Sequence, residues 1–164
     1  MNKFLILIGF LTTISYGQSN KYAEVTALSS VDFEGLKPHL TTQSDSTYIV
    51  NFWATWCKPC VEELPLFESI SKRYKKKKVA VILVSLDFPK HRDTALLEFI
   101  KKHQLQSEVI HLDDPKEQQW IPKVDPNWTG SIPATLIYDA KKRKFYEQTF
   151  KKGALENELI NFLK

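Results

Sequence analysis

Cysteine is scarce in this chain, since Cys57 and Cys60 are the only two among its 164 residues. A small secreted scaffold that depends on disulfides needs a framework of several bridges, so this count excludes that class of protein. Within the chain, each cysteine can form a disulfide only with the other. The pair therefore favours reversible thiol–disulfide chemistry over a structural bridge.

Internal repeats, low-complexity tracts and interdomain linkers are also lacking, so residues 18–164 are interpreted as one domain. The net charge of +4 comes largely from lysine runs at 72–78 and 141–144. Aromatic residues are not interleaved with these runs as they are in nucleic-acid stacking surfaces. We therefore expect solvated surface at both runs and no nucleic-acid partner.

The N-terminus lacks an apolar run long enough to span a bilayer comfortably. Lys3 precedes an apolar stretch at 4–14, and Ser15 and Gly17 place small residues before a cleavage point. These features predict a signal peptide over residues 1–17, with an uncleaved anchor or a buried first strand as the alternative. No cysteine follows that could carry a lipid. We expect export, most simply to the periplasm, with secretion beyond it as the alternative.

Hydrophobic periodicity predicts strands and helices that alternate, followed by a hairpin and a last helix. The predicted strands are 47–54, 79–86, 108–112, 134–138 and 144–150. The predicted helices are 59–74, 89–103 and 155–163. Residues 18–45 are expected to be irregular, with a short strand near 24–28 and a turn at 34–35, and residues 113–129 are expected to form a loop. This order predicts an α/β fold of three layers, with a central mixed sheet flanked by helices.

The sequence Cys57-Lys58-Pro59-Cys60 directly follows an apolar, aromatic strand and begins a helix. Unpaired N–H groups and the positive end of the helix dipole at this point stabilise a thiolate over a thiol. Pro59 has a fixed φ that suits the first helical turn. The charge of Lys58 either stabilises the adjacent thiolate or points into solvent, and the sequence favours neither.

Three separated segments carry a family resemblance: Phe-Trp-Ala-Thr-Trp-Cys-Lys-Pro-Cys at 52–60, Glu-Leu-Pro at 63–65 and Gly-Ser-Ile-Pro-Ala-Thr at 130–135. In this order they resemble the TlpA/ResA-like exported thiol–disulfide oxidoreductases of the thioredoxin superfamily. The resemblance covers nearly all of residues 45–163. It implies a thioredoxin-like three-layer fold and a redox-active disulfide in place of any other cofactor.

The resemblance assigns roles to the two thiols and to a proline. Cys57, at the exposed start of the helix, is the expected attacking thiolate, and the more shielded Cys60 is the expected resolving thiol. Pro133 falls on the position of the family's cis-proline, beside the disulfide, where a trans proline in an ordinary turn is the alternative. There it leaves the backbone of Ile132 free to pair with an extended substrate.

Glu63 lies three residues after Cys60 and therefore on the same helical face. A carboxyl group held near the thiols in an apolar wall would have a raised pKa and could shuttle a proton to or from Cys60. A surface glutamate, as expected for Glu62, is the alternative. Asn51 occupies the position where many thioredoxins have a buried aspartate, and an asparagine cannot perform that proton transfer.

Aromatic residues surround this site in the sequence. Trp56 is expected to shield the thiols at the rim, and we expect it to contact substrate together with Lys58, Pro59 and Ile132. Trp120 and Trp128 flank a long loop and form either an apolar substrate platform or ordinary packing. The histidines at 91, 103 and 111 have no spacing that makes a metal site with the cysteines, so we expect them to be solvated or capping residues and expect no metal.

The predicted function is reduction or oxidation of disulfides in exported proteins. The resemblance favours reduction, as in cytochrome c maturation or disulfide repair, with electrons from a membrane-bound donor. A copper-binding or metal-delivery module built on the two cysteines is one alternative, although such a site normally needs further soft or imidazole ligands. A thiol peroxidase and a redox-inactive domain with a structural disulfide are the others.

Overall fold

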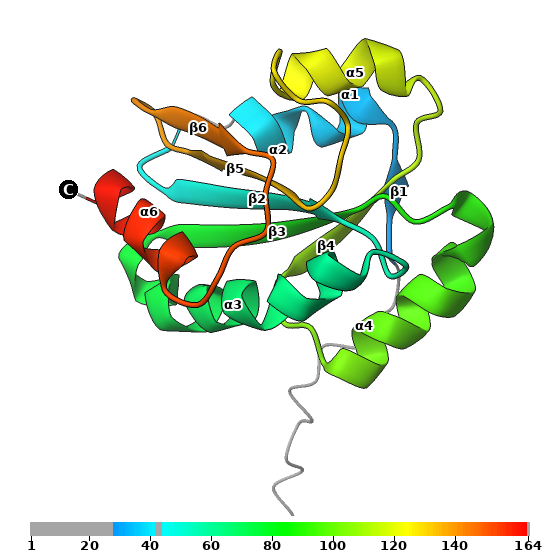
Figure 1. The fold of residues 1–164 in the computed structure, drawn as a ribbon, viewed down its shortest axis with the longest axis horizontal. Coiled ribbons are helices and arrows are strands. Elements are labelled where there is room, and N and C mark those ends of the chain that lie inside the picture. Colours follow the sequence, from blue (N-terminus) through cyan, green and yellow to red (C-terminus); the bar gives the residue numbers. More distant parts are fainter. Residues whose placement is uncertain (1–27, 42–43, 164) are drawn as a thin grey trace, which may run out of the picture.

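The computed structural model describes residues 28–41 and 44–163, which form a single six-stranded sheet with helices around it (Figure 1). The strands are β1 (Ser30–Val31), β2 (Thr47–Trp53), β3 (Val79–Ser85), β4 (Glu108–Leu112), β5 (Ala134–Tyr138) and β6 (Arg143–Tyr146). They lie side by side in the order β1-β4-β3-β2-β5-β6. The first four are parallel, whereas β5 runs antiparallel to both β2 and β6. The predicted central mixed sheet is confirmed.

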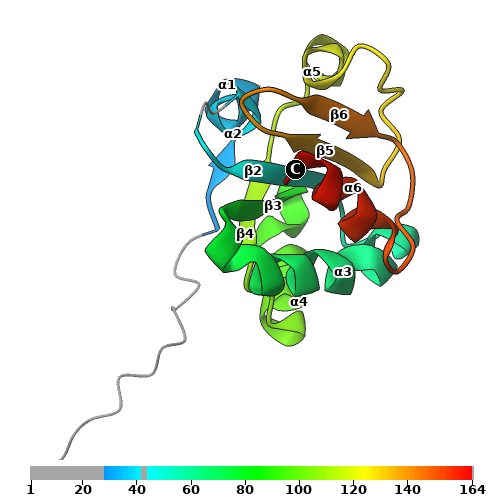
Figure 2. The same cartoon turned by 90° about the vertical axis from the view of Figure 1, so that its left-hand side faces the viewer.

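Helices cover both faces of this sheet. They are α1 (Phe33–Leu36), α2 (Pro38–Thr41), α3 (Lys58–Tyr74), α4 (Leu97–His103), α5 (Glu117–Val124) and α6 (Ala154–Phe162). Figures 1 and 2 both show α3, α4 and α6 on one face, with α1, α2 and α5 on the other. The prediction of a three-layer α/β fold is therefore confirmed.

The central strand β2 is apolar on both faces because both faces are covered. Ile49 and Trp53 pack in the core beneath α3, α4 and α6. Val50 and Phe52 point the opposite way, into the core beneath α1, α2 and α5. Since side chains alternate along a strand, Asn51 lies on the α3 face, between Ile49 and Trp53. The alternation thus places one polar group inside an otherwise apolar layer.

The helix α3 follows β2 after a short turn, and its buried positions Leu64, Phe67 and Ile70 recur every three or four residues. This stripe packs against the sheet. Pro65 lies within the helix, which continues through it to Tyr74. The packing of β2 against α3 fixes where the first turn of α3 begins, and that turn carries both cysteines.

Two segments predicted as irregular contain helices. The sequence predicts a turn at 34–35, but residues 33–41 contain the helices α1 and α2. Asp32 caps α1 by accepting a hydrogen bond from the Gly35 N–H (2.9 Å). The segment 113–129 contains α5, although Pro122 lies inside it. Burial of Trp120 and Val124 against the sheet stabilises α5 despite the proline. In both places tertiary burial overrides a local sequence signal.

Other element boundaries differ from the prediction. The helix predicted at 89–103 consists of a 3₁₀ turn at Pro89–His91, a π turn at Arg92–Leu96 and then α4. The last strand ends at Tyr146, and the chain continues irregularly to the buried Phe150. Strands β2 to β5 and helix α6 lie within a residue of their predicted positions.

The predicted signal peptide at 1–17 lies outside the described residues, and so do residues 24–27 of the strand predicted near 24–28. Among the described residues, β1 at Ser30–Val31 forms one edge of the sheet. Among residues 28–41 and 44–163, no helix combines the length and the apolar character that crossing a membrane would need.

Candidate redox site

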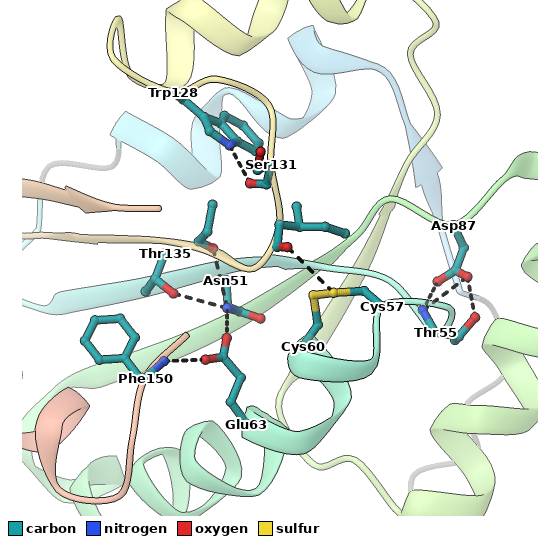
Figure 3. Close-up of a disulfide and its surroundings, with 12 residues drawn as sticks. Asn51, Thr55, Cys57, Cys60, Glu63, Asp87, Trp128, Ser131, Thr135 and Phe150 are labelled. Atoms are coloured by element: carbon teal, nitrogen blue, oxygen red, sulfur yellow. Dashed lines mark hydrogen bonds between the residues drawn. A yellow bond between two sulfur atoms is a disulfide. The ribbon is translucent and has the colours of Figure 1, made fainter. Parts of the chain in front are cut away.

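The two cysteines form a disulfide at the first turn of α3 (Figure 3), with an S–S distance of 2.04 Å and Cα atoms 5.3 Å apart. Cys57 is the N-cap residue of α3, and Cys60 lies within its first turn. The prediction of an exposed Cys57 is wrong for this disulfide form, since the residue is only 6% exposed. Cys57 is nevertheless the more exposed of the two cysteines, as predicted, because Cys60 is 0% exposed.

The two residues between the cysteines face solvent. Pro59 occupies the start of α3, where its missing N–H has no helical acceptor to lose. The Lys58 side chain is 87% exposed, and its Nζ lies 3.9 Å from a carboxylate oxygen of Glu62. This placement agrees with a solvated Lys58, and an exposed pair of this length contributes little energy.

Opposite the disulfide lies the loop that leads into β5. Its Ile132–Pro133 peptide bond is cis, as predicted, and Pro133 is buried. The carbonyl oxygen of Ile132 lies 3.8 Å from Cys57 Sγ (Figure 3). The loop is held from behind by the Trp128 indole N–H, which donates to the carbonyl of Ser131 at 2.8 Å. The tertiary fold therefore brings residues 75 positions apart into contact across the disulfide.

Glu63 is buried, at 2% exposure, as the functional interpretation required, whereas Glu62 is exposed. Its two carboxylate oxygens accept hydrogen bonds from Asn51 Nδ2 (3.1 Å) and from the backbone N–H of Phe150 (2.7 Å). Burial raises the pKa of Glu63 to about 7, against the lowering effect of these two donors. The carboxyl group can therefore take up or release a proton near neutral pH.

A second buried carboxylate, Asp87, was not identified from the sequence. It accepts hydrogen bonds from the Thr55 N–H (3.0 Å), the Thr55 hydroxyl (2.5 Å) and the Ser85 hydroxyl (2.8 Å). Asp87 thereby anchors the turn that presents Cys57. The signal that could have found it is its place just beyond β3, because ligands and functional groups gather at the carboxyl ends of parallel strands.

The aromatic residues take different positions from one another. Trp56 is 57% exposed, and its ring stacks on the equally exposed ring of Phe88 with centroids 6.2 Å apart. Trp120 and Trp128 are buried and donate their indole N–H groups to backbone carbonyls. The structure therefore favours packing over a substrate platform for these two.

The interpretation of His111 as solvated or capping is wrong, because its side chain is fully buried. One ring nitrogen lies 2.6 Å from the Ser30 hydroxyl and the other 2.8 Å from the carbonyl of Asp87. His111 lies on β4, a strand buried inside the sheet. The short sequence of β4 does not indicate that this position is covered, which explains the error. In the described part of the chain, no group of three or more His, Cys, Asp or Glu side chains is arranged to hold a metal ion.

Comparisons with known proteins agree with a thiol–disulfide site. The model of the AhpC/TSA family matches residues 21–143. The thiol–disulfide oxidoreductase ResA of Geobacillus thermodenitrificans is 31% identical over 167 residues, covering 94% of this chain and 91% of the relative. ResA of Bacillus thuringiensis subsp. konkukian is 36% identical over 78 residues, which span 48% of this chain but only 43% of that relative.

Solved structures agree on the fold. A thiol:disulfide interchange protein of the thioredoxin family from Chlorobium tepidum superposes with a TM-score of 0.60 at 21% identity. The superposition covers 73% of this chain and 81% of that one. At this identity the likeness supports a thioredoxin-like fold.

Proposed function

The chain belongs to the AhpC/TSA family, among the thioredoxin-like relatives of the thiol–disulfide oxidoreductase ResA, and from this premise we propose that it reduces disulfide bonds of exported proteins. The observation that carries the proposal is the Cys57–Cys60 disulfide at the start of α3, with the cis-proline loop in contact with it. Cytochrome c maturation and repair of wrongly formed disulfides are the processes that such a reductant would serve.

The proposed reaction consists of two thiol–disulfide exchanges. The Cys57 thiolate attacks one sulfur of the substrate disulfide, and the other substrate sulfur leaves as a thiolate and takes up a proton. Cys60 then loses its proton and attacks the Cys57 sulfur of the mixed disulfide. The second substrate thiol is released, and the Cys57–Cys60 disulfide remains. Two electrons pass from the pair to the substrate.

The substrate is proposed to bind along the cis-proline loop. The Ile132 carbonyl beside Cys57 offers a backbone acceptor to an extended chain, in the way that a strand adds to a sheet edge. Trp56, Lys58 and Pro59 are exposed and adjoin the two cysteines along the chain. These groups would contact the residues that flank the substrate cystine.

Electrostatics support the direction of the proposal. A strongly oxidising pair is one whose reduced, thiolate form is stabilised. Here the charge of Lys58 is exposed and next to Glu62, while Glu63 places a carboxyl group one helical turn from Cys60. Above its raised pKa of about 7, Glu63 carries a negative charge that disfavours a thiolate nearby. This arrangement favours the disulfide over the dithiol and hence a reducing pair.

The compartment and the partners are part of the same proposal. The leader predicted at 1–17 supports export to the periplasm, with secretion beyond it as the alternative. There a reductant needs a supply of electrons, for which we propose a membrane-bound thiol donor. The Cys57–Cys60 pair serves as the redox centre without any further cofactor.

The equilibrium reduction potential of the pair, measured against glutathione buffers, tests the direction. We expect a value at or below that of thioredoxin, about −270 mV. A value at or above about −180 mV, in the range of protein disulfide isomerase and DsbA, would contradict the reductant proposal. A Cys57→Ser, Cys60→Ser double variant serves as the blank. The reduced wild type should reduce insulin disulfides, and the double variant should not.

A further inference from the structure

Asn51 lies beside the disulfide in the buried part of the site, and its Nδ2 donates to Glu63 (Figure 3). Its side chain is fully buried, and its Nδ2 lies within hydrogen-bond distance of Glu63 Oε1 (3.1 Å), Thr135 Oγ1 (3.1 Å) and the Ala134 carbonyl (3.4 Å). Its Oδ1 is also buried, but it has no hydrogen-bond partner among the described residues. Figure 3 shows this oxygen pointing to the side of Cys60.

A buried amide oxygen without a partner is rare and costs free energy, so it calls for a physical explanation. Rotating the amide does not remove the problem. The rotated oxygen could accept a hydrogen bond from the Thr135 hydroxyl, but the Ala134 carbonyl and the Glu63 carboxyl group would lose this donor, and the NH₂ group would face the disulfide. The observed orientation satisfies Nδ2 fully. It leaves one acceptor directed at the redox pair.

The oxidation state decides whether that acceptor has a donor. In the disulfide, neither sulfur carries a hydrogen. Reduction breaks the S–S bond with two electrons and adds two protons, so that Cys60 gains an S–H group. A thiol is a weak hydrogen-bond donor, and an amide oxygen in an apolar surrounding is a suitable acceptor for it.

We propose that Asn51 is a positioning residue for the reduced state, in which its Oδ1 accepts a hydrogen bond from the Cys60 thiol while its Nδ2 continues to hold Glu63. The amide thus fixes the resolving thiol and the buried carboxyl group relative to each other. It transfers no proton itself. This inference rests on the proposed redox function of the pair and adds a residue that acts through Cys60.

Two consequences follow from this arrangement. The hydrogen bond exists only in the dithiol form, so it stabilises that form relative to the disulfide and moderates how strongly reducing the pair is. It also stabilises the protonated Cys60 thiol, which keeps this sulfur from attacking before a mixed disulfide has formed on Cys57. Both consequences concern the Cys60 sulfur and leave the fold unchanged.

The S–H stretching band in the infrared spectrum gives a direct test. In a Cys57→Ser background, Cys60 is the only thiol of the protein. We expect its band at the lower frequency of a hydrogen-bonded thiol, and Asn51→Leu should move it to the frequency of a free thiol. Thr135→Val is the matched control, since it removes another partner of the same Nδ2 and leaves Oδ1 in place. A band that stays unmoved in Asn51→Leu would overturn the proposal.

A measurement on the wild type avoids dependence on a variant that fails to fold. The ¹³Cγ resonance of Asn51 should shift downfield on reduction, because its oxygen gains a donor. The exposed Asn157 should show no such shift. If the Asn51 resonance is the same in both redox states, the hydrogen bond does not form and the inference is wrong.

The equilibrium constant with glutathione provides the functional measure. Losing the hydrogen bond should favour the disulfide about tenfold in Asn51→Leu, which is about 30 mV toward a more negative potential. Thr135→Val should stay within about twofold of the wild type. An unchanged or more positive potential in Asn51→Leu would contradict the proposal. The reductant proposal depends on the wild-type potential alone, so the two can fail separately.

Discussion

The buried carboxyl group of Glu63 makes the stability of this protein depend on pH in an unusual direction. Its pKa is about 7 in the folded chain against 4.5 for an ordinary glutamate. The folded state therefore binds this proton more tightly than the unfolded chain does. Stability from this group is complete below about pH 4.5 and is lost as the pH rises through 7.

The size of the effect follows from the two pKa values. One pKa unit corresponds to about 1.4 kcal/mol, so a pKa raised from 4.5 to about 7 amounts to about 3 kcal/mol. About 2.5 kcal/mol of this falls between pH 5 and pH 8. Glu63→Gln removes the ionisation and keeps the shape. It also turns an amide NH₂ toward one of the donors Asn51 and Phe150, which costs about 1–3 kcal/mol at every pH.

Urea unfolding of the oxidised protein at pH 5 and pH 8 separates these two contributions. We expect Glu63→Gln to gain about 2.5 kcal/mol relative to the wild type between the two pH values, whatever its offset at pH 5. Glu62→Gln, on the exposed neighbouring position, should follow the wild type at both. A difference between Glu63→Gln and wild type that changes by less than about 0.5 kcal/mol would refute a near-neutral pKa for Glu63.

Three further predictions concern the turn and the thiols of the site. Asp87→Ala leaves the part-buried donors of Thr55 and the buried hydroxyl of Ser85 without this acceptor, and it should destabilise the protein by about 3 kcal/mol in urea unfolding. The exposed Asp93→Ala should cost about 0.5 kcal/mol, and equal losses would show that Asp87 does not anchor the turn. In the reduced protein, limiting alkylating reagent should label Cys57 before Cys60, as read by mass mapping, and Cys60→Ser should accumulate mixed disulfides with substrates. Preferential labelling of Cys60 would reverse the assigned roles.

Local patterns in the sequence were sufficient for the centre of the fold. The apolar, β-branched runs of β2 and β3 are typical of strands covered on both faces, and the helical spacing after Pro59 predicts α3 behind them. The cysteine pair at this junction was therefore placed correctly at a helix start. The cis isomer of the Ile132–Pro133 bond was predicted through the family resemblance, since no local rule distinguishes it from a trans proline.

Sequence patterns were enough to identify the candidate site residues, whereas the groups that surround these residues depend on the tertiary fold. Helical spacing placed Glu63 near Cys60, but the Phe150 N–H that holds its carboxyl group is 87 residues away along the chain. The anchoring of Thr55 by Asp87 and the burial of His111 arise from strands brought together by the sheet. Hydrophobic periodicity reports which residues are buried, but hydrogen bonds between distant side chains depend on positions that only the assembled core defines.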